Sequence, residues 1–351
     1  MKSKHFLYSP SFYRGFSTRA VLLAACLVLT FTSIADAQKY RYFGTQLTDW
    51  SVFTFPGAGG QIRWRILKNE NPSVPPGVIY DIPFGQTATE FVPNQGDYTG
   101  DGIDDFALYR GNTGTPANHY IIGRSSGGTD WILWGNSTTD IIGAEGDYDG
   151  DGRMDLTVVR APTASSPFQW WVMRSSDSTI SVFTFGNNAT DIALPGADYT
   201  GDGTDDPAVA RIGGTGQITW IVGTTAGAQL SQVVWGNFNT DFVIPAGDYD
   251  GDLKADYMVW RGFGAVDGVW YLLTNSGTVS YTRLGTTGGA AVRDTALRSG
   301  DYDGDGRTDI ALYRPSTLTF YVLRSSGGGV QTQPWGVAGN TNLPIASFGV
   351  F

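Results

Sequence analysis

One acidic loop recurs five times along this chain of 351 residues, at nearly constant spacing. Its sequence is close to D-x-D-G-D-G, and successive copies begin 50, 51, 50 and 53 residues apart. The copies begin at Asp97, Asp147, Asp198, Asp248 and Asp301. A fixed period of this length is typical of repeat folds, in which each repeat supplies one structural unit. The loop therefore predicts a repeat architecture, and its carboxylates predict cation binding.

A second marker, an aromatic residue or leucine followed by glycine, occurs six times. The six copies are Phe84-Gly85, Trp134-Gly135, Phe185-Gly186, Trp235-Gly236, Leu284-Gly285 and Trp335-Gly336. Between each loop and the next marker lie three short runs rich in β-branched and aromatic residues, and a fourth run leads into the next loop. This pattern predicts an all-β protein, a six-bladed β-propeller of four-stranded antiparallel blades, with seven blades as the alternative.

Six markers against five loops mean that one unit lacks the acidic loop. The first unit aligns Asp49 with Asp309 of the last loop, but no D-x-D-G-D-G precedes it. The run 342–351 resembles the segment before each loop and then stops. We expect this run, around residues 343–348, to pair beside residues 49–55 and complete the first blade. Such pairing of N- and C-terminal strands closes the ring and leaves no open sheet edge.

The N-terminal segment has the pattern of a secretory signal peptide. Four basic residues precede an apolar run, and Ala35-Asp36-Ala37 supplies a cleavage signal. Cys26 lies within the apolar run and also fits a lipoprotein cleavage box; because apolar residues continue after it, we favour cleavage after Ala37. The protein is thus expected to be secreted or at the cell surface, without membrane insertion after cleavage.

The remaining chain, residues 38–351, is expected to form a single propeller domain. Its blade units are expected at about 48–85 plus 342–351, 86–135, 136–186, 187–236, 237–285 and 286–336.

The charge of the exported chain is strongly acidic. Removing residues 1–37 takes away four of the 23 basic residues and one of the 33 acidic residues, which leaves 19 against 32, a formal charge of −13. This acidity argues against nucleic acid and anionic membranes as partners. Of the 32 acids, 18 lie at ligand positions of the five loops. Metal sites therefore account for most of the acidity.

The loops place oxygen side chains at positions 1, 3, 5 and 9, counted from the first aspartate, with glycine at position 4. An EF-hand needs a bidentate acid at position 12. Here position 12 is always apolar: Leu108, Val158, Val209, Val259 and Leu312. RTX calcium repeats stack in tandem, unlike these separated loops. Oxygen ligands on a flexible loop suit Ca2+ better than Mg2+, and no histidine or cysteine accompanies them for zinc.

The loop, its following strand and the marker resemble the FG-GAP and VCBS repeat families, whose members include the integrin α-subunit propellers. The resemblance covers residues 43–351. It implies that each loop binds Ca2+ between the first two strands of a blade, with a backbone carbonyl at position 7. The implied ligands are Asp97, Thr99, Asp101, Ile103 and Asp105; Asp147, Asp149, Asp151, Arg153 and Asp155; Asp198, Thr200, Asp202, Thr204 and Asp206; Asp248, Asp250, Asp252, Lys254 and Asp256; Asp301, Asp303, Asp305, Arg307 and Asp309.

The five expected sites are not equivalent. Thr99 and Thr200 replace an aspartate at position 3, which predicts weaker binding in those loops. Leu253 stands where glycine is usual at position 6, so the loop at Asp248 departs most from the pattern. We expect Ca2+ to act mainly on the structure, because a cation that binds the native state stabilises it.

Arginine at position 14 and tyrosine at position 2 also recur in every loop unit. The arginines are Arg110, Arg160, Arg211, Arg261 and Arg314. We expect them to pair with loop carboxylates or to cap strand ends, and a ligand-binding ring of arginines is the alternative. The tyrosines are expected to pack each loop against its neighbour.

An enzyme is the least supported class of function. The exported chain has one histidine, His119, no cysteine and no nucleophile motif. We expect a secreted calcium-binding propeller that acts as a binding or adhesion module for an extracellular protein or polysaccharide. The alternatives are a carbohydrate-binding lectin and a structural component of the cell surface.

Overall fold

The structure is a computed structural model that describes most of the chain after the expected signal peptide. The described residues are 40–55, 60–70, 79–86, 90–93, 95–111, 118–136, 138–244, 247–262, 267–286, 293–298 and 300–345. The predicted signal peptide, its cleavage site after Ala37 and Cys26 lie outside these ranges. Within them no helix is present, so none could cross a membrane.

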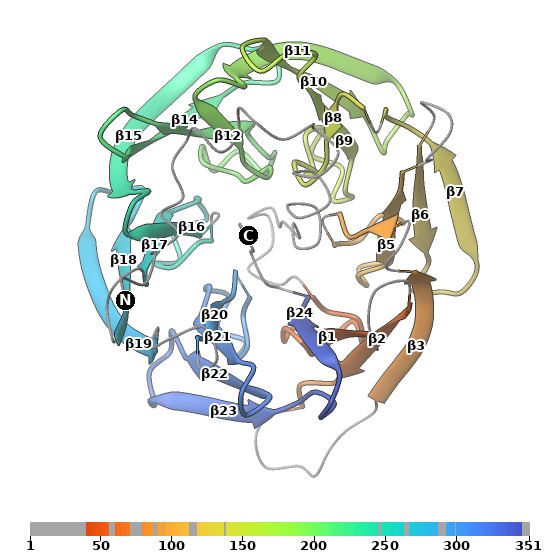
Figure 1. The fold of residues 1–351 in the computed structure, drawn as a ribbon, viewed down its shortest axis with the longest axis vertical. Helices are drawn as coiled ribbons and strands as arrows, with labels where there is room; N and C mark the ends of the chain where they lie inside the picture. Colours follow the sequence, from red (N-terminus) through yellow and green to blue (C-terminus); the bar gives the residue numbers. More distant parts are fainter. Residues whose placement is uncertain are drawn as a thin grey trace, which may run out of the picture.

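Six four-stranded antiparallel sheets stand as blades around a central axis (Figure 1). The first blade contains β1 (Trp50–Phe55), β2 (Gln61–Leu67), β3 (Ile79–Gln86) and β24 (Thr341–Pro344). The second contains β4 (Glu90–Phe91), β5 (Phe106–Arg110), β6 (His119–Gly123) and β7 (Thr129–Leu133). The third contains β8 (Asp140–Ile141), β9 (Leu156–Arg160), β10 (Pro167–Met173) and β11 (Ile180–Asn187).

The other three blades repeat this order. The fourth contains β12 (Asp191–Ala193), β13 (Ala208–Ile212), β14 (Gln217–Gly223) and β15 (Gln229–Asn237). The fifth contains β16 (Asp241–Ile244), β17 (Tyr257–Arg261), β18 (Asp267–Leu273) and β19 (Val279–Thr286). The sixth contains β20 (Thr295–Ala296), β21 (Ile310–Arg314), β22 (Thr319–Leu323) and β23 (Val330–Pro334). The all-β, six-bladed prediction is confirmed.

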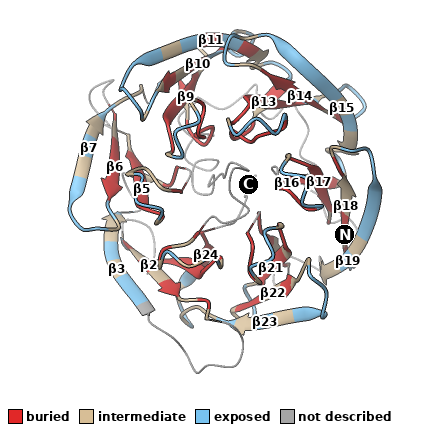
Figure 2. Ribbon diagram, turned by 180° about the vertical axis from the view of Figure 1, so that it is seen from behind, coloured by how far each residue is buried: buried red, intermediate tan, exposed pale blue. Residues whose placement is uncertain are grey.

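Burial falls from the second strand of a blade to its outermost strand (Figure 2). In the third blade β9 is buried at four of its five positions, whereas the outer strand β11 alternates between exposed and covered residues. The second strand is covered on both faces because neighbouring blades pack against it. The third strand supplies a fully buried tryptophan, such as Trp170, whose indole donates to the carbonyl of the marker residue Phe185 at 2.8 Å.

The marker glycines are required by contact between blades. Gly186 has a φ of +85°, and a Cβ added to it would lie 2.9 Å from Cγ1 of Val209 in the next blade. Gly236 and Val259 repeat this arrangement at 2.8 Å. The apolar residue at position 12 therefore packs onto the glycine of the preceding blade, which explains why both residue types recur.

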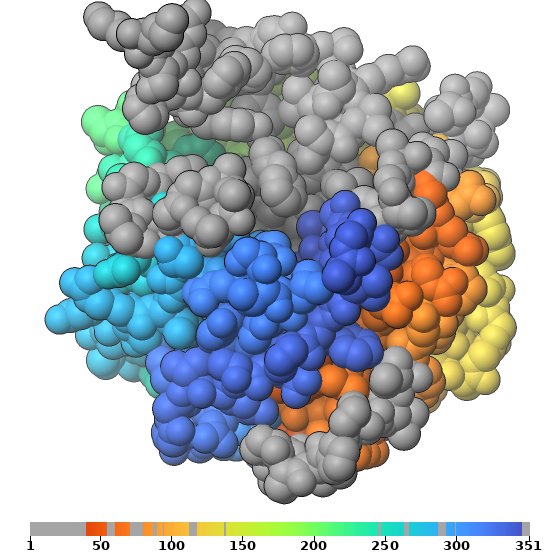
Figure 3. Space-filling view, turned by 60° about the horizontal axis from the view of Figure 1, so that its bottom comes forward, coloured from red at the N-terminus to blue at the C-terminus, as the bar shows by residue number. Residues whose placement is uncertain are grey.

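The first and last described strands meet in the first blade, as predicted. β24 pairs antiparallel with β1, with Leu343 opposite Phe53, and the amide of Ile345 donates to the carbonyl of Ser51 at 3.0 Å. Figure 3 shows the blue C-terminal segment lying against the orange N-terminal segment. The predicted strand at residues 343–348 is observed two residues earlier, at 341–344, and residues 346–351 lie outside the described part of the chain.

Candidate metal centres in the ring of loops

Each acidic loop connects the innermost strand of a blade to the second strand. In the third blade the loop lies between β8 and β9, and the amide of Asp155 donates to the carbonyl of Gly146 at 2.8 Å. The same bond closes the other four acidic loops, at 2.8 to 3.0 Å. Asp at position 9 therefore stands at the base of a hairpin, where the sequence placed it.

The aspartate at position 1 shapes the loop through backbone amides. Asp147 accepts from Gly150 N at 2.7 Å through Oδ1 and from Gly152 N at 2.8 Å through Oδ2. Asp97, Asp198, Asp248 and Asp301 accept from the amides at positions 4 and 6 in the same way. Because the amides point inward, glycine with a positive φ occupies position 4 in all five loops.

The aspartate at position 9 joins the loop to the turn between the third and fourth strands. Asp155 accepts from Tyr148 N at 3.0 Å and from Ser175 N at 2.7 Å. Burial raises the pKa of Asp155 to about 7, and it does the same for Asp256 and Asp309. In the two loops that carry threonine, burial raises the pKa of Asp105 and Asp206 to about 6. These carboxylates thus lie where ionisation is costly without a compensating positive charge.

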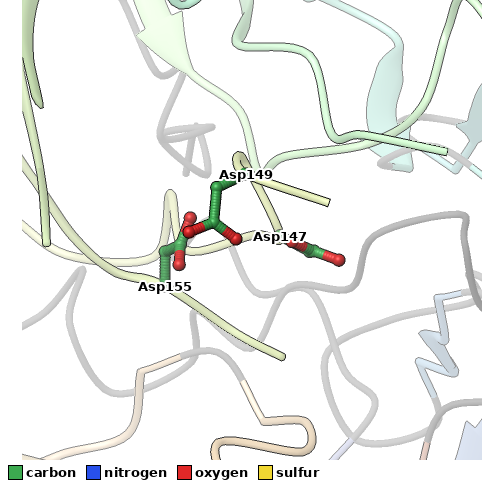
Figure 4. A group of neighbouring side chains, drawn as sticks. All are labelled: Asp147, Asp149 and Asp155. Atoms are coloured by element: carbon green, nitrogen blue, oxygen red, sulfur yellow. The ribbon is translucent and has the colours of Figure 1, made fainter. Parts of the chain in front are cut away.

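Three loops bring the carboxylates at positions 1, 3 and 9 together. One oxygen from each lies within 4.8 Å of the others in the groups Asp147, Asp149 and Asp155; Asp248, Asp250 and Asp256; and Asp301, Asp303 and Asp309. Figure 4 shows the first group on its loop. In two of these groups the position 3 aspartate has a buried oxygen, Oδ1 of Asp149 and of Asp303, with no hydrogen-bond partner. Buried carboxylate oxygens of this kind fit a hard divalent cation.

The other predicted ligands are arranged differently. At position 5, Asp151 forms an ion pair with Arg153, with Nη2 2.6 Å from Oδ2, and accepts from Ser175 Oγ at 2.8 Å. Asp305 pairs with Arg307 in the same way. Among the described residues the position 5 carboxylates therefore do not belong to the converging groups. The position 7 carbonyls of Ile103, Arg153, Thr204, Lys254 and Arg307 stay a prediction from the family resemblance.

The loops that depart from the pattern do so in two ways. In the loops with threonine at position 3, the hydroxyl bonds to a neighbouring carboxylate: Thr200 Oγ1 lies 3.3 Å from Oδ1 of Asp198. Neither of these loops forms a converging group of three carboxylates within the described residues. Leu253 at position 6 takes a φ of +64°, which is unfavourable for leucine. Its loop nevertheless brings Asp248, Asp250 and Asp256 together.

The first blade contains a sixth loop, which could not be identified from the sequence because the acidic residues of the motif are absent from it. Residues 41–49 follow the same path as the acidic loops: Asp49 N donates to Tyr40 O at 2.9 Å, and Asp49 accepts from Phe43 N and Asn69 N. Gly44 has a φ of +65° at position 4. Positions 1, 3 and 5, however, are Arg41, Phe43 and Thr45. The prediction that this unit lacks the loop is correct for the acidic ligands and wrong for the backbone.

The six loops form a hydrogen-bonded ring. The amide at position 8 of one loop donates to the position 1 carbonyl of the preceding loop at 2.7 to 2.8 Å. The five pairs observed are Met154–Asp97, Asp205–Asp147, Ala255–Asp198, Thr308–Asp248 and Thr48–Asp301. At the remaining joint, Tyr40 N donates to Oδ2 of Asp104 at 2.5 Å. Each position 4 glycine also faces the position 7 side chain of the next loop, as Gly150 faces Thr204.

The recurrent arginines lie at the opposite ends of the same strands, away from the loops. Arg261 on β17 pairs with Asp241 on β16, with Nε 2.6 Å from Oδ1 and Nη2 2.9 Å from Oδ2. The other pairs are Arg110–Glu90, Arg160–Asp140, Arg211–Asp191 and Arg314–Asp294. The prediction of pairing with loop carboxylates is wrong, because the partner is a buried acid on the innermost strand or, for Asp294, directly before it. Each of these acids lies 20 residues before its arginine, a constant spacing that is visible in the sequence.

Each acid at these pairs also caps a turn between blades. Asp241 accepts from Asn237 N at 2.9 Å, and Asp140 accepts from Asn136 N at 2.8 Å. The recurrent tyrosines pack as expected: Tyr302 stacks on Trp50 in the next blade, with ring centroids 4.8 Å apart.

No family model and no curated protein matches the chain. Two solved structures are similar to the chain at low identity. One is a protein of unknown function from Bacteroides caccae, 12% identical, with 78% of this chain and 83% of that chain covered and a TM-score of 0.38. The other is AofleA from Arthrobotrys oligospora, 12% identical, with 90% and 96% covered and a TM-score of 0.43. At these values the similarities carry no conclusion about function.

Proposed function

We propose that the protein is a secreted, calcium-stabilised propeller of the FG-GAP and VCBS type that acts as a binding or adhesion module. The observation that carries the calcium part is the convergence of three carboxylates in each of three loops, two of them with an unpartnered buried oxygen. When bound, Ca2+ supplies positive charge to oxygen ligands that otherwise repel one another.

Two aspartates of each loop would allow the bound Ca2+ to stabilise the fold. Position 1 orders the loop amides, and position 9 fixes the turn between the third and fourth strands. A cation shared by these two carboxylates would therefore hold the loop and that turn to each other. Neighbouring loops would stay aligned as well, because the position 1 carbonyl accepts the amide of the next loop.

Calcium titration of the unfolding temperature tests this proposal. Chelated protein should melt at a lower temperature than protein with millimolar Ca2+, since each site filled at a hundred times its Kd adds about 2.7 kcal/mol to the free energy of unfolding. Asp149→Asn should reduce the calcium-dependent increase. The matched control is Asp267→Asn, an exposed aspartate outside the loops that should leave the increase intact. Identical melting with and without Ca2+ would refute the calcium part.

The binding role rests on the expected export, the acidic net charge of the exported chain and the lack of a recognised catalytic motif in the sequence. A ligand that is a protein or a polysaccharide would be bound through the blades or their connecting loops. Calcium-loaded protein applied to immobilised glycans and to extracellular surface proteins measures this role. Failure to bind either class would favour a structural component of the cell surface, and turnover of a polysaccharide would favour an enzyme.

A further inference from the structure

The turn between the third and fourth strands of a blade contacts the acidic loop of the same blade. In the third blade this turn contains Ser175 and Ser176, which follow β10. The amide of Ser175 donates to the position 9 aspartate, Asp155. The hydroxyl of Ser176 donates to Oδ2 of the position 3 aspartate, Asp149, at 2.5 Å. The two serines of one turn therefore bond two of the three carboxylates that converge in this loop.

The sixth blade repeats this contact with the same geometry. Ser326 Oγ donates to Oδ2 of Asp303 at 2.5 Å. In both blades the turn reads Arg-Ser-Ser, at residues 174–176 and 324–326. The serine lies 27 residues after its aspartate in the third blade and 23 residues after it in the sixth, so the fold brings the two groups together.

The contact leaves one oxygen of each position 3 aspartate for a cation. Oδ1 of Asp149 and Oδ1 of Asp303 are buried and have no hydrogen-bond partner among the described residues. The serine holds Oδ2, so the carboxylate is restrained from turning about its terminal bond. Oδ1 is thus the oxygen that can ligate a cation, in a loop where positions 1, 3 and 9 each bring one oxygen within 4.8 Å of the others. Carboxylates that ligate metals are commonly oriented by hydrogen bonds of this kind.

The fifth blade shows the arrangement when the serine has another partner. Ser276 occupies the corresponding place in the turn, but its hydroxyl lies 3.5 Å from Oδ2 of Asp250 and 2.7 Å from Oγ1 of Thr274. Thr274 stands where the other two turns have arginine. Asp250 is exposed, whereas Asp149 and Asp303 are half-buried. The position 3 carboxylate of this loop is therefore held less firmly, although it belongs to a converging group.

We propose that Ser176 and Ser326 are positioning residues of two calcium centres: each hydroxyl holds the position 3 aspartate so that its Oδ1 stays available to ligate Ca2+. Ca2+ then binds more tightly in the third and sixth blades than in the fifth. This inference rests on the proposed calcium-stabilised function, and it identifies residues outside the D-x-D-G-D-G loop that set the affinity of the loop.

Calorimetric titration of the exported chain, residues 38–351, with Ca2+ tests this role. A background carrying Asp250→Asn and Asp303→Asn leaves the third-blade group as the one converging group of three carboxylates among the described residues. In this background Ser176→Ala should weaken Ca2+ binding by about tenfold or more, the usual effect of losing a hydrogen bond to a metal ligand. Ser176→Thr keeps a hydroxyl donor and should restore the affinity to within about threefold of the background protein.

Thr179→Val is the matched control in the same turn. Thr179 Oγ1 donates to Oδ1 of Asp177 at 2.7 Å, so the substitution removes a hydroxyl–carboxylate bond that does not reach the loop. It should leave the Ca2+ affinity unchanged. In chelator, Ser176→Ala should unfold close to the temperature of the background protein, because its hydrogen bond is exposed. An equal fall of the unfolding temperature in chelator and in Ca2+ would mean that the serine only stabilises the turn, and would overturn the inference.

A second readout uses the wild-type chain, in which Ser176→Ala and Ser326→Ala together should reduce the number of tightly bound Ca2+ ions. Unchanged affinity in Ser176→Ala, an equal loss in Thr179→Val, or a loss that threonine does not restore would also overturn the inference. Absence of Ca2+ binding to wild type would refute the calcium part of the proposed function together with it. Ca2+ binding that is insensitive to both serines would leave that function intact and remove only their role.

Discussion

Single residues in the ring of loops serve two contacts at once. Gly150 takes a left-handed φ of +75°, and it also faces the next loop, where an added Cβ would lie 2.7 Å from Cγ2 of Thr204. Gly152 in the same loop has a φ of +84° and open space around it. The sequence predicted glycine from the curl of the loop. It could not predict the contact, because that contact joins residues 54 positions apart.

The two glycines allow a matched comparison. Both Gly150→Ala and Gly152→Ala force alanine into the left-handed region, which costs about 1–2 kcal/mol. Only Gly150→Ala also pushes the neighbouring loop away, so it should lower the free energy of unfolding further than Gly152→Ala does. Chemical denaturation in calcium measures both values. Equal losses would show that the contact between loops contributes nothing.

Asp49 in the sixth loop predicts a pH dependence of stability. Burial raises its pKa from 3.8 to about 7; Asp104 adds to the shift, while two backbone amides and Lys68 oppose it. Between about pH 4 and 7 the folded protein then holds a proton that the unfolded chain has lost, so stability falls as the pH rises through this interval and is level above it. Asp49→Asn removes this effect. The difference in unfolding free energy, wild type minus variant, should therefore decrease from pH 4 to pH 7. A constant difference would contradict the raised pKa.

At the scale of strands, the first blade shows how an ion pair with a buried carboxylate can be replaced. Where the fifth blade pairs Arg261 with Asp241, the first blade pairs Thr54 on β1 with Asn342 on β24. Asn342 Oδ1 accepts from Val337 N at 2.8 Å, as Asp241 accepts from Asn237 N. The turn before the innermost strand is therefore capped in both blades, by the charged Asp241 in the fifth and by the neutral Asn342 in the first.

This pair of blades predicts the result of a double substitution. Arg261→Thr alone leaves the buried carboxylate of Asp241 without its partner and should cost about 1–3 kcal/mol. Arg261→Thr combined with Asp241→Asn reproduces the pair of the first blade and should recover most of that loss. The denaturant midpoints of wild type and of the two variants measure how much stability the second substitution restores. A double variant less stable than the single one would contradict the equivalence of the two pairs.

Much of the strand arrangement could be predicted from the sequence, because each unit repeats its signals. The loops and the markers predicted six blades, with seven as the alternative, and aspartate at position 9 predicted the position of each hairpin. The partner of Arg261 was missed because Asp241 lies outside the motif, before the loop. The sixth loop was missed because the motif was defined by ligand side chains. Its path depends instead on Gly44 and Asp49, which match the glycine at position 4 and the aspartate at position 9 of the acidic loops.

At the scale of the whole molecule, the ring depends on one short strand from the C-terminus. Removing residues 341–351 takes away β24 and the fully buried Ile345. Loss of that side chain alone should cost about 2 kcal/mol, and the loss of pairing with β1 should add to this. Removal of residues 346–351, which leaves β24 in place, is the control. The longer deletion should lower the unfolding temperature well below that of the shorter one. Equal unfolding temperatures would mean that this strand does not close the ring.

The sixth loop lies in the same blade as that closing strand. It keeps the loop path with one carboxylate, Asp49, where the acidic loops have three or four. If the acidic loops depend on Ca2+, the loop of the first blade, where β1 and β24 close the ring, does not. A fall in calcium outside the cell would then loosen the five blades that carry acidic loops, while the first blade keeps the pairing of β1 with β24. The ring would become less rigid but would stay closed, and the acidic loops would become ordered again when Ca2+ returned.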